Sequence, residues 1–184
     1  PRGRQLVDNF RIIEREHARY LRQLGSQAEG IADDLLLIRR MAMKTTARNQ
    51  FLGKVAEVKQ GAVNDEVTLE LPGGQHIVAI VTQGSSASLG LVPGAEAFAL
   101  IKASSIILVA DSAGARFSAR NQLAGLVTRV QTGAVNTEVV LDLPRGGTIA
   151  AIITNQSSTD LGIAIGSSVT AIFKASSVIL GVPA

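Results

Sequence analysis

The sequence contains no cysteine and no tryptophan, and aromatic residues make up only 3% of its 184 positions. Without cysteine there is no disulfide framework, no thiolate metal site and no thiol nucleophile. The shortage of aromatic side chains leaves little surface on which nucleic-acid bases could stack. A chain without disulfides suits a reducing compartment, and we expect a cytoplasmic protein.

Long apolar runs are missing as well. No stretch approaches the ~20 apolar residues that a membrane-spanning helix needs, and the first residues do not follow the pattern of a signal peptide. We therefore expect no contact with a membrane. The chain begins at Pro1 rather than at a methionine, which we interpret as a fragment or a processed product.

Groups that could support catalysis are scarce. The chain has two histidines, His17 and His76, and His17 is best interpreted as a packed or rim residue. His76 corresponds to Thr148 in the internal repeat described below. No Ser/His/Asp set and no cluster with metal-ligand spacing is present in the sequence, so we expect no enzyme.

The net charge of +3 is unevenly distributed. Residues 1–46 hold nine Lys or Arg and six Asp or Glu, whereas residues 47–184 hold nine of each. A protein that binds nucleic acid through its backbone would need a denser basic face. We expect DNA to be contacted, if at all, only through a domain upstream of this chain.

What the chain does have is an internal repeat. The sequence Thr-Thr-Ala-Arg-Asn-Gln at 45–50 returns as Phe-Ser-Ala-Arg-Asn-Gln at 117–122, and the offset of 72 holds without a gap from there on. About half of the paired positions are identical. Each copy has about 65 residues, close to the smallest size of a domain that folds alone. The sequence therefore predicts two copies of one unit.

Residues 1–44 precede the repeat and have a helical pattern. Apolar and aromatic residues recur there at alternating spacings of three and four, which predicts an amphipathic helix with a narrow stripe. The stripe consists of Leu6, Phe10, Ile13, His17, Tyr20 and Leu24. Gly25-Ser26 ends this helix, and Asp33-Asp34 begins a second, shorter one. A narrow stripe must pack on another helix, so we predict a linker and dimerisation segment and a homodimer.

From about residue 44 onward the hydrophobic period changes from 3.6 to 2. Strands are predicted at 67–71, at 76–82 and over 97–109, the last as one long strand or two, with counterparts at 139–143, 148–154 and 169–180. Many short strands between glycine-rich turns are typical of a small barrel or sandwich. The prediction is a first barrel at 45–110 and a second at 117–184, held in contact by the short linker 111–116.

Both copies share a set of small hydrogen-bond donors. In the first copy these residues are Thr46, Arg48, Thr82, Ser85, Lys102 and Ser104, and in the second they are Ser118, Arg120, Thr154, Ser157, Lys174 and Ser176. Many donors with few acceptors and moderate positive charge are what a small oxyanion requires. For each position alone a structural role is favoured: hydroxyls in turns serve the turn, and Asn49 and Asn121 are expected to hydrogen-bond the local backbone. Both interpretations stay open, because folding constraints repeat as well as function does.

Four motifs carry a resemblance to a known family. They are Ala-Arg-Asn-Gln followed by Gly, Gly-Ala-Val-Asn-x-Glu-Val, Thr-x-x-Ser-x-x-x-Leu-Gly and Lys-Ala-Ser-Ser-x-Ile-Leu. In tandem over 45–181 they resemble the molybdate-binding Mop module. The helical segment before them resembles the connector of ModE-type molybdate-responsive transcription regulators, which carry an upstream winged helix-turn-helix.

The resemblance implies a mainly β fold with two tandem OB-like five-stranded barrels, a homodimer, and molybdate, or tungstate, bound where subunits meet. Carried over by position, Thr46, Ala47 and Arg48 would contact the oxyanion from one chain. Thr82, Ser85 and Lys102 would contact it from the other chain, and Ser104 belongs to the same predicted set of binding residues. The second copy preserves Ser118, Arg120, Thr154, Ser157 and Lys174. The family's usual serine is replaced by Thr46, whose added methyl group would tighten the pocket.

Three functions are compatible with this resemblance. The favoured one is the molybdate-sensing effector domain of a dimeric transcription regulator, without its DNA-binding domain. The alternatives are a tandem-Mop storage protein and the regulatory domain of a molybdate transporter. The helical segment favours the regulator, since storage proteins of this type resemble bare barrels. No Walker A pattern occurs in the sequence, so this chain contains no transporter ATPase.

Overall fold

The computed structural model describes residues 45–110 and 114–183. The chain divides into two units, 1–44 and 45–184, and the description below concerns the second. The helices predicted within 1–44, with their apolar stripe, lie outside the described residues, as do positions 111–113 of the predicted linker.

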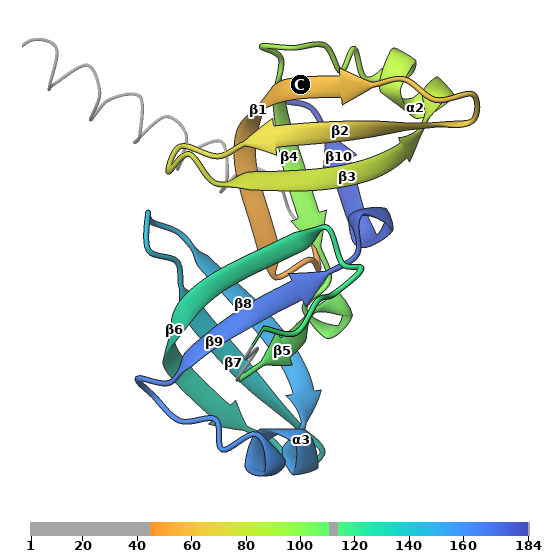
Figure 1. Ribbon diagram of the computed structural model, residues 1–184. Helices are drawn as coiled ribbons and strands as arrows, with labels where there is room; N and C mark the ends of the chain where they lie inside the picture. Colours follow the sequence, from red (N-terminus) through yellow and green to blue (C-terminus); the bar gives the residue numbers. More distant parts are fainter. Residues whose placement is uncertain (1–44, 111–113, 184) are drawn as a thin grey trace, which may run out of the picture. The chain divides into compact units, whose positions relative to one another are not determined.

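Ten strands and four short helices make up the described residues (Figure 1). The first copy contains β1 (Asn49–Lys59), β2 (Asn64–Glu70), β3 (His76–Thr82), α2 (Gln83–Ser88), β4 (Glu96–Ile101), the 3-10 helix η1 (Ala103–Ser105) and β5 (Ile107–Val109). The second contains β6 (Asn121–Thr132), β7 (Asn136–Asp142), β8 (Thr148–Thr154), α3 (Asn155–Asp160), β9 (Ser168–Phe173), η2 (Ala175–Ser177) and β10 (Val178–Gly181). The predicted mainly β fold of two tandem five-stranded units is confirmed. The sequence pattern did not reveal α2 and α3, because each is a short, polar, serine-containing helix without an apolar period to detect.

The strands alternate as their period of two requires. In β2 the side chains of Val67 and Leu69 are fully buried, and Val139 and Leu141 take the same places in β7. Each barrel also needs a glycine at one close approach. A Cβ atom at Gly53 would lie 2.6 Å from the carbonyl oxygen of Glu70, and one at Gly125 would make the matching clash. The glycine of the repeated motif is thus explained by packing between β1 and β2 and between β6 and β7.

The two sheets exchange their last strands. One sheet has the order β10-β4-β1-β2-β3 and the other has the order β5-β9-β6-β7-β8. The predicted strand or strands over 97–109 are therefore two strands, interrupted by η1, and β5 leaves the sheet that β4 belongs to. In return β10 pairs with β4, with Val178 opposite Ile101. Sheet membership does not follow the repeat boundaries at these strands, and the division into barrels at 45–110 and 117–184 stays a prediction.

Two asparagines connect the sheets reciprocally. The Asn49 side chain donates from Nδ2 to the carbonyl oxygens of Ile101 (3.2 Å) and Ala150 (2.8 Å), and its Oδ1 accepts from the Ala150 amide at 2.7 Å. The Asn121 side chain accepts from the Val78 amide at 2.7 Å and donates to the Val78 carbonyl at 2.8 Å. Both side chains are buried.

The expectation that these asparagines bond the local backbone is wrong. Their main partners, Ala150 on β8 and Val78 on β3, are 101 and 43 positions away in the sequence. The physical reason is the strand exchange. It brings the start of β1 against β8 and the start of β6 against β3, where backbone groups would otherwise be buried without a partner.

We expect Asn49→Ala to lower the free energy of unfolding markedly. It leaves the amide and the carbonyl of the half-buried Ala150 without their side-chain partner, and each such group left unpaired out of water costs about 1–3 kcal/mol. Urea denaturation measures the loss. Gln122→Ala is the matched control, because the exposed Gln122 side chain donates to the nearby Ala119 carbonyl, and its effect should stay within about 0.5 kcal/mol. Equal effects of the two substitutions would contradict the role of Asn49.

Candidate functional site

The pairing of β1 with β4 brings two predicted site residues together. Asn49 and Ile101 are the last pair of this antiparallel ladder, so Arg48 and Lys102 both adjoin the same end of it. The pairing of Asn121 with Phe173 does the same for Arg120 and Lys174 in the second copy. All four cationic side chains are exposed. Each copy therefore presents a pair of cations at the start of its first strand.

The other residues of the Ala-Arg-Asn-Gln motif shape the loop before β1. Thr46 is exposed and Ala47 is half-buried. The Gln50 side chain donates from Nε2 to the Ala47 carbonyl at 3.3 Å, and Gln122 makes the equivalent bond in the second copy. The exposed Ser118 stands at the position of Thr46. Ser104 is exposed on η1, directly after Lys102 and Ala103. The hydroxyls of Thr46 and Ser104 thus lie in the segments that flank the two cations.

Thr82 and Ser85 form a cap at the other end of the sheet. The Thr82 hydroxyl accepts from the Ser85 amide at 3.1 Å and donates to the Ser85 hydroxyl at 2.8 Å. Thr154 and Ser157 repeat the arrangement at α3, with distances of 3.0 and 2.8 Å. An N-cap hydroxyl satisfies one of the backbone donors that a helix leaves open. The structural role weighed for these hydroxyls is therefore present in the structure, while all four side chains still reach the surface.

Within one chain these two groups are far apart. Arg48 precedes the first residue of β1, whereas α2 is tied to the turn after the last residue of β1 by a hydrogen bond from the Gln83 amide to the Val63 carbonyl (3.1 Å). Ten steps along a strand cover about 33 Å when the strand is straight. Figure 1 shows α2 beside the turn that joins β1 to β2, at the far end from the start of β1. One chain therefore does not collect Arg48, Lys102, Thr82 and Ser85 into one pocket.

Each motif arginine is paired with a glutamate of the other sheet. Arg48 Nη1 lies 3.2 Å from Glu138 Oε2 on β7, and Arg120 Nη2 lies 2.9 Å from Glu66 Oε1 on β2. Glu138 also contacts Arg129, and Glu66 lies 3.6 Å from Lys59. The sequence contained a signal for these partners, since both glutamates belong to the repeated Gly-Ala-Val-Asn-x-Glu-Val motif. More than half of each arginine side chain is exposed, so these ion pairs are weak and exchangeable.

Other chemistry has little support in the part of the chain that the structure describes. No three His, Cys, Asp or Glu side chains lie there in an arrangement that could hold a metal ion. Within the same residues, no helix has the length and hydrophobicity needed to cross a membrane.

Comparison with known proteins places the chain in a family. The TOBE domain family matches residues 45–108 and 118–180. The molybdenum transport protein ModE of Herbaspirillum seropedicae is 40% identical over 182 residues, which are 99% of this chain and 68% of that protein. The DNA-binding transcriptional dual regulator ModE of Escherichia coli K12 is 35% identical over 147 residues, 79% of this chain and 55% of that protein.

A solved structure agrees with both the fold and the repeat. The cytoplasmic molybdate-binding protein ModG, in a crystal form with molybdate bound, is 48% identical, with a TM-score of 0.75. The match covers 77% of this chain and all of that one. The predicted resemblance to the tandem Mop domains of ModE-type proteins is thus confirmed. Two copies of the TOBE model match, and the alignment with the Herbaspirillum relative covers 99% of this chain. This chain therefore belongs to the TOBE domain family.

Proposed function

We propose that this chain binds molybdate in a site shared by two copies of itself. The single observation that carries the proposal is the separation of the donor groups. Arg48 and Lys102 stand at one end of the first sheet, and the Thr82–Ser85 cap stands at the other. A second copy can bring the partner's Thr82 and the partner's Ser85 to the cations of the first. The register of β1 and β4 supports a different division from the expected one, in which Lys102 is contributed by the same chain as Arg48.

The chemistry of these residues suits a tetrahedral dianion. Guanidinium, ammonium, hydroxyl and backbone N–H groups donate hydrogen bonds, and a dianion removed from water needs several such charge-assisted partners. The bound molybdate of ModG and the names of the ModE relatives support molybdate, with tungstate as an isosteric second ligand. No step of chemical conversion is needed for this role, and the relatives are binding and regulatory proteins rather than enzymes.

The regulator is the favoured context of this site. The E. coli relative is a DNA-binding transcriptional regulator, and residues 1–44 precede the TOBE copies here as a connector would. DNA would be contacted through an upstream domain, and the protein would work in the cytoplasm as a homodimer. A molybdate store remains the second candidate, because ModG aligns over its entire length with this chain. A winged helix-turn-helix encoded before Pro1 would support the regulator, and its absence there would support the store.

The function is tested by calorimetry of the chain with four oxyanions. Molybdate and tungstate are expected to bind, whereas sulfate and phosphate are expected to give little heat. Donors placed around the larger molybdate ion leave gaps around sulfate and phosphate, which are smaller tetrahedral ions. Equal heats for sulfate and molybdate would contradict the proposal.

A shared site also predicts complementation between two defective chains. Arg48→Ala and Ser85→Ala should each weaken molybdate binding, the arginine variant by about ten- to a hundredfold, since a charged hydrogen bond contributes about 1.5–3 kcal/mol. When the two variants are mixed in equal amounts and allowed to exchange subunits, about half of the dimers are heterodimers, and each heterodimer contains one first-copy site with both residues intact. Calorimetry of the mixture should then show tight binding at about a quarter of the wild-type number of first-copy sites.

Two controls accompany this experiment. Sedimentation of the unmodified chain without ligand should show a dimer, and a stable monomer would remove the basis of the shared site. The empty Arg48→Ala variant should melt close to the wild type, because Arg48 is exposed. If tight binding never returns in the mixture although heterodimers form, the groups act within one chain.

Glu138 should oppose the ligand that Arg48 binds. Its carboxylate forms an ion pair with the Arg48 guanidinium and adds negative charge next to the proposed site for a dianion. We expect Glu138→Gln to raise molybdate affinity by about two- to fivefold, since an ion pair this exposed is worth up to about 1 kcal/mol. Glu57→Gln is the control, because Glu57 pairs with Lys59 rather than with a motif arginine. A weaker affinity in Glu138→Gln would show instead that the glutamate positions Arg48 for the ligand.

A further inference from the structure

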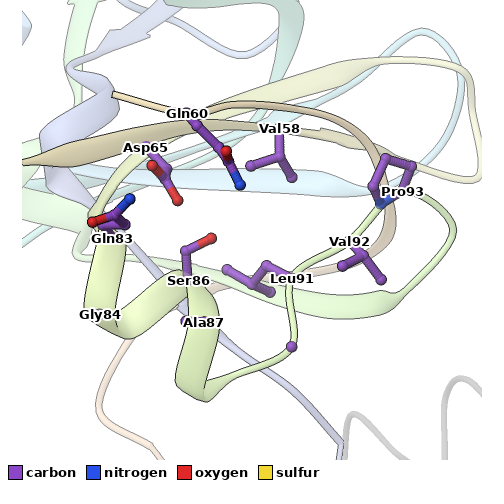
Figure 2. A pocket seen from close by; sticks show the side chains of 11 residues that line it. Val58, Gln60, Asp65, Gln83, Gly84, Ser86, Ala87, Leu91, Val92 and Pro93 are labelled. Carbon is purple, nitrogen blue, oxygen red and sulfur yellow. The ribbon is translucent and has the colours of Figure 1, made fainter. Parts of the chain in front are cut away.

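The first barrel contains a pocket that the proposed molybdate site does not use. It has a volume of about 520 Å³ and lies between α2, the last residues of β1 and the first residues of β2. Four polar side chains, from Gln60, Asp65, Gln83 and Ser86, are directed into it, opposite an apolar wall that includes Leu91, Val92 and Pro93 (Figure 2). Thr82 and Ser85 do not line this pocket. We propose that the pocket is a second ligand site, for a small organic cation that carries a planar amidinium or guanidinium group on an apolar body.

The buried carboxylate of Asp65 sets the charge of this ligand. Asp65 is 2% exposed. Its Oδ1 accepts one hydrogen bond from the Gly61 amide at 3.2 Å, and no cation among the described residues forms an ion pair with it. A buried carboxylate is stabilised by an opposite charge that also donates hydrogen bonds. Figure 2 shows the carboxylate facing the open space, where such a group can reach it.

Ser86 supplies a second, independent sign of a ligand. This residue is 5% exposed, and Figure 2 shows its hydroxyl pointing to the centre of the pocket. The described residues contain no fully buried side-chain polar atom without a partner, and no hydrogen bond joins this hydroxyl to another of these residues, so its oxygen is open to the pocket. A buried hydroxyl is normally paired, and one that faces a pocket is available to a bound molecule. The amide groups of Gln60 and Gln83 add further acceptor oxygens around the same space.

The second barrel has a different set of polar side chains at the same place. At the position of Asp65 it has Thr137, and at the position of Gln83 it has Asn155. Thr137 Oγ1 donates to Asn155 Oδ1 at 2.8 Å, and Asn155 Nδ2 donates to the Gly133 carbonyl at 3.0 Å. These polar groups satisfy one another. Since the two barrels have the same fold, the open arrangement in the first barrel follows from its own side chains and not from a requirement of folding.

A planar cation fits this arrangement better than a compact one. An amidinium presents two parallel N–H donors, which match the two oxygens of a carboxylate. Its remaining N–H groups can reach the Ser86 hydroxyl and the glutamine oxygens. The apolar body can cover Leu91, Val92 and Pro93, which lie across the pocket. Small-molecule sites commonly combine such an apolar wall with a few convergent polar groups.

The test uses benzamidine as the probe and the whole chain as the protein. In an amide NMR titration we expect saturable shifts at Gly61, Asp65 and Ser86 and no shifts at the matching positions of the second barrel. Benzamide, which is neutral and has nearly the same shape, should bind at least about tenfold more weakly, because it lacks the charge that Asp65 requires. Asp65→Asn keeps an acceptor for the Gly61 amide and should weaken benzamidine binding by a similar factor.

A double substitution provides the matched structural control. Asp65→Thr with Gln83→Asn copies the hydrogen-bonded pair of the second barrel into the first and should abolish the shifts while molybdate calorimetry stays unchanged. If this variant fails to melt cooperatively, Asp65→Asn and the comparison with benzamide still decide. Equal binding of benzamide and benzamidine, undiminished shifts in Asp65→Asn, or no saturation up to about 10 mM would overturn the proposal.

Discussion

The reciprocal hydrogen bonds of Asn49 and Asn121 are the constraint on which the described structure depends. Each asparagine satisfies backbone groups of a strand in the opposite sheet, and each is buried where water cannot replace the lost bonds. The strand exchange depends on the same junction, because β5 and β10 cross there to complete the opposite sheets. A barrel of about 65 residues has little core of its own. Two such barrels that share strands and buried hydrogen bonds form one larger structure in place of two marginal ones.

The junction also determines where the charged groups of the proposed molybdate site lie. Arg48 immediately precedes Asn49. The hydrogen bonds that hold the Asn49 side chain therefore also restrict the backbone position of Arg48. Lys102 follows Ile101, whose carbonyl accepts one of the Asn49 bonds. The cations are thus carried next to these buried hydrogen bonds, while their side chains stay exposed. A rigid backbone holds the exposed donors at defined positions, which suits the binding of a small ion.

Much of this architecture could be predicted from the sequence, because the repeat and the period of two are both local patterns. Val67, Leu69 and their counterparts in the second copy identified the core faces of β2 and β7. The strand exchange could not be predicted, since η1 consists of Ala103, Ser104 and Ser105, which are compatible with either direction of the chain that follows. The asparagine partners could not be predicted either, because a side chain that bonds a strand 101 positions away leaves no local pattern in the sequence. The repeated motifs named the candidate donors, but only the register of β1 with β4 showed that Arg48 and Lys102 adjoin the same end of one ladder.

With the proposed shared site, ligand binding and association of the chains are coupled equilibria. Each half of the site offers an incomplete set of donors, so a monomer binds molybdate weakly and a dimer binds it well. The ligand must then stabilise the dimer by the same free energy by which dimerisation improves the binding of the ligand. The glutamates on the motif arginines adjust this balance, because they occupy Arg48 and Arg120 until a dianion competes for them. A sensor built in this way responds to the concentration of the oxyanion through the arrangement of its subunits, and each barrel can remain folded and unchanged in both states.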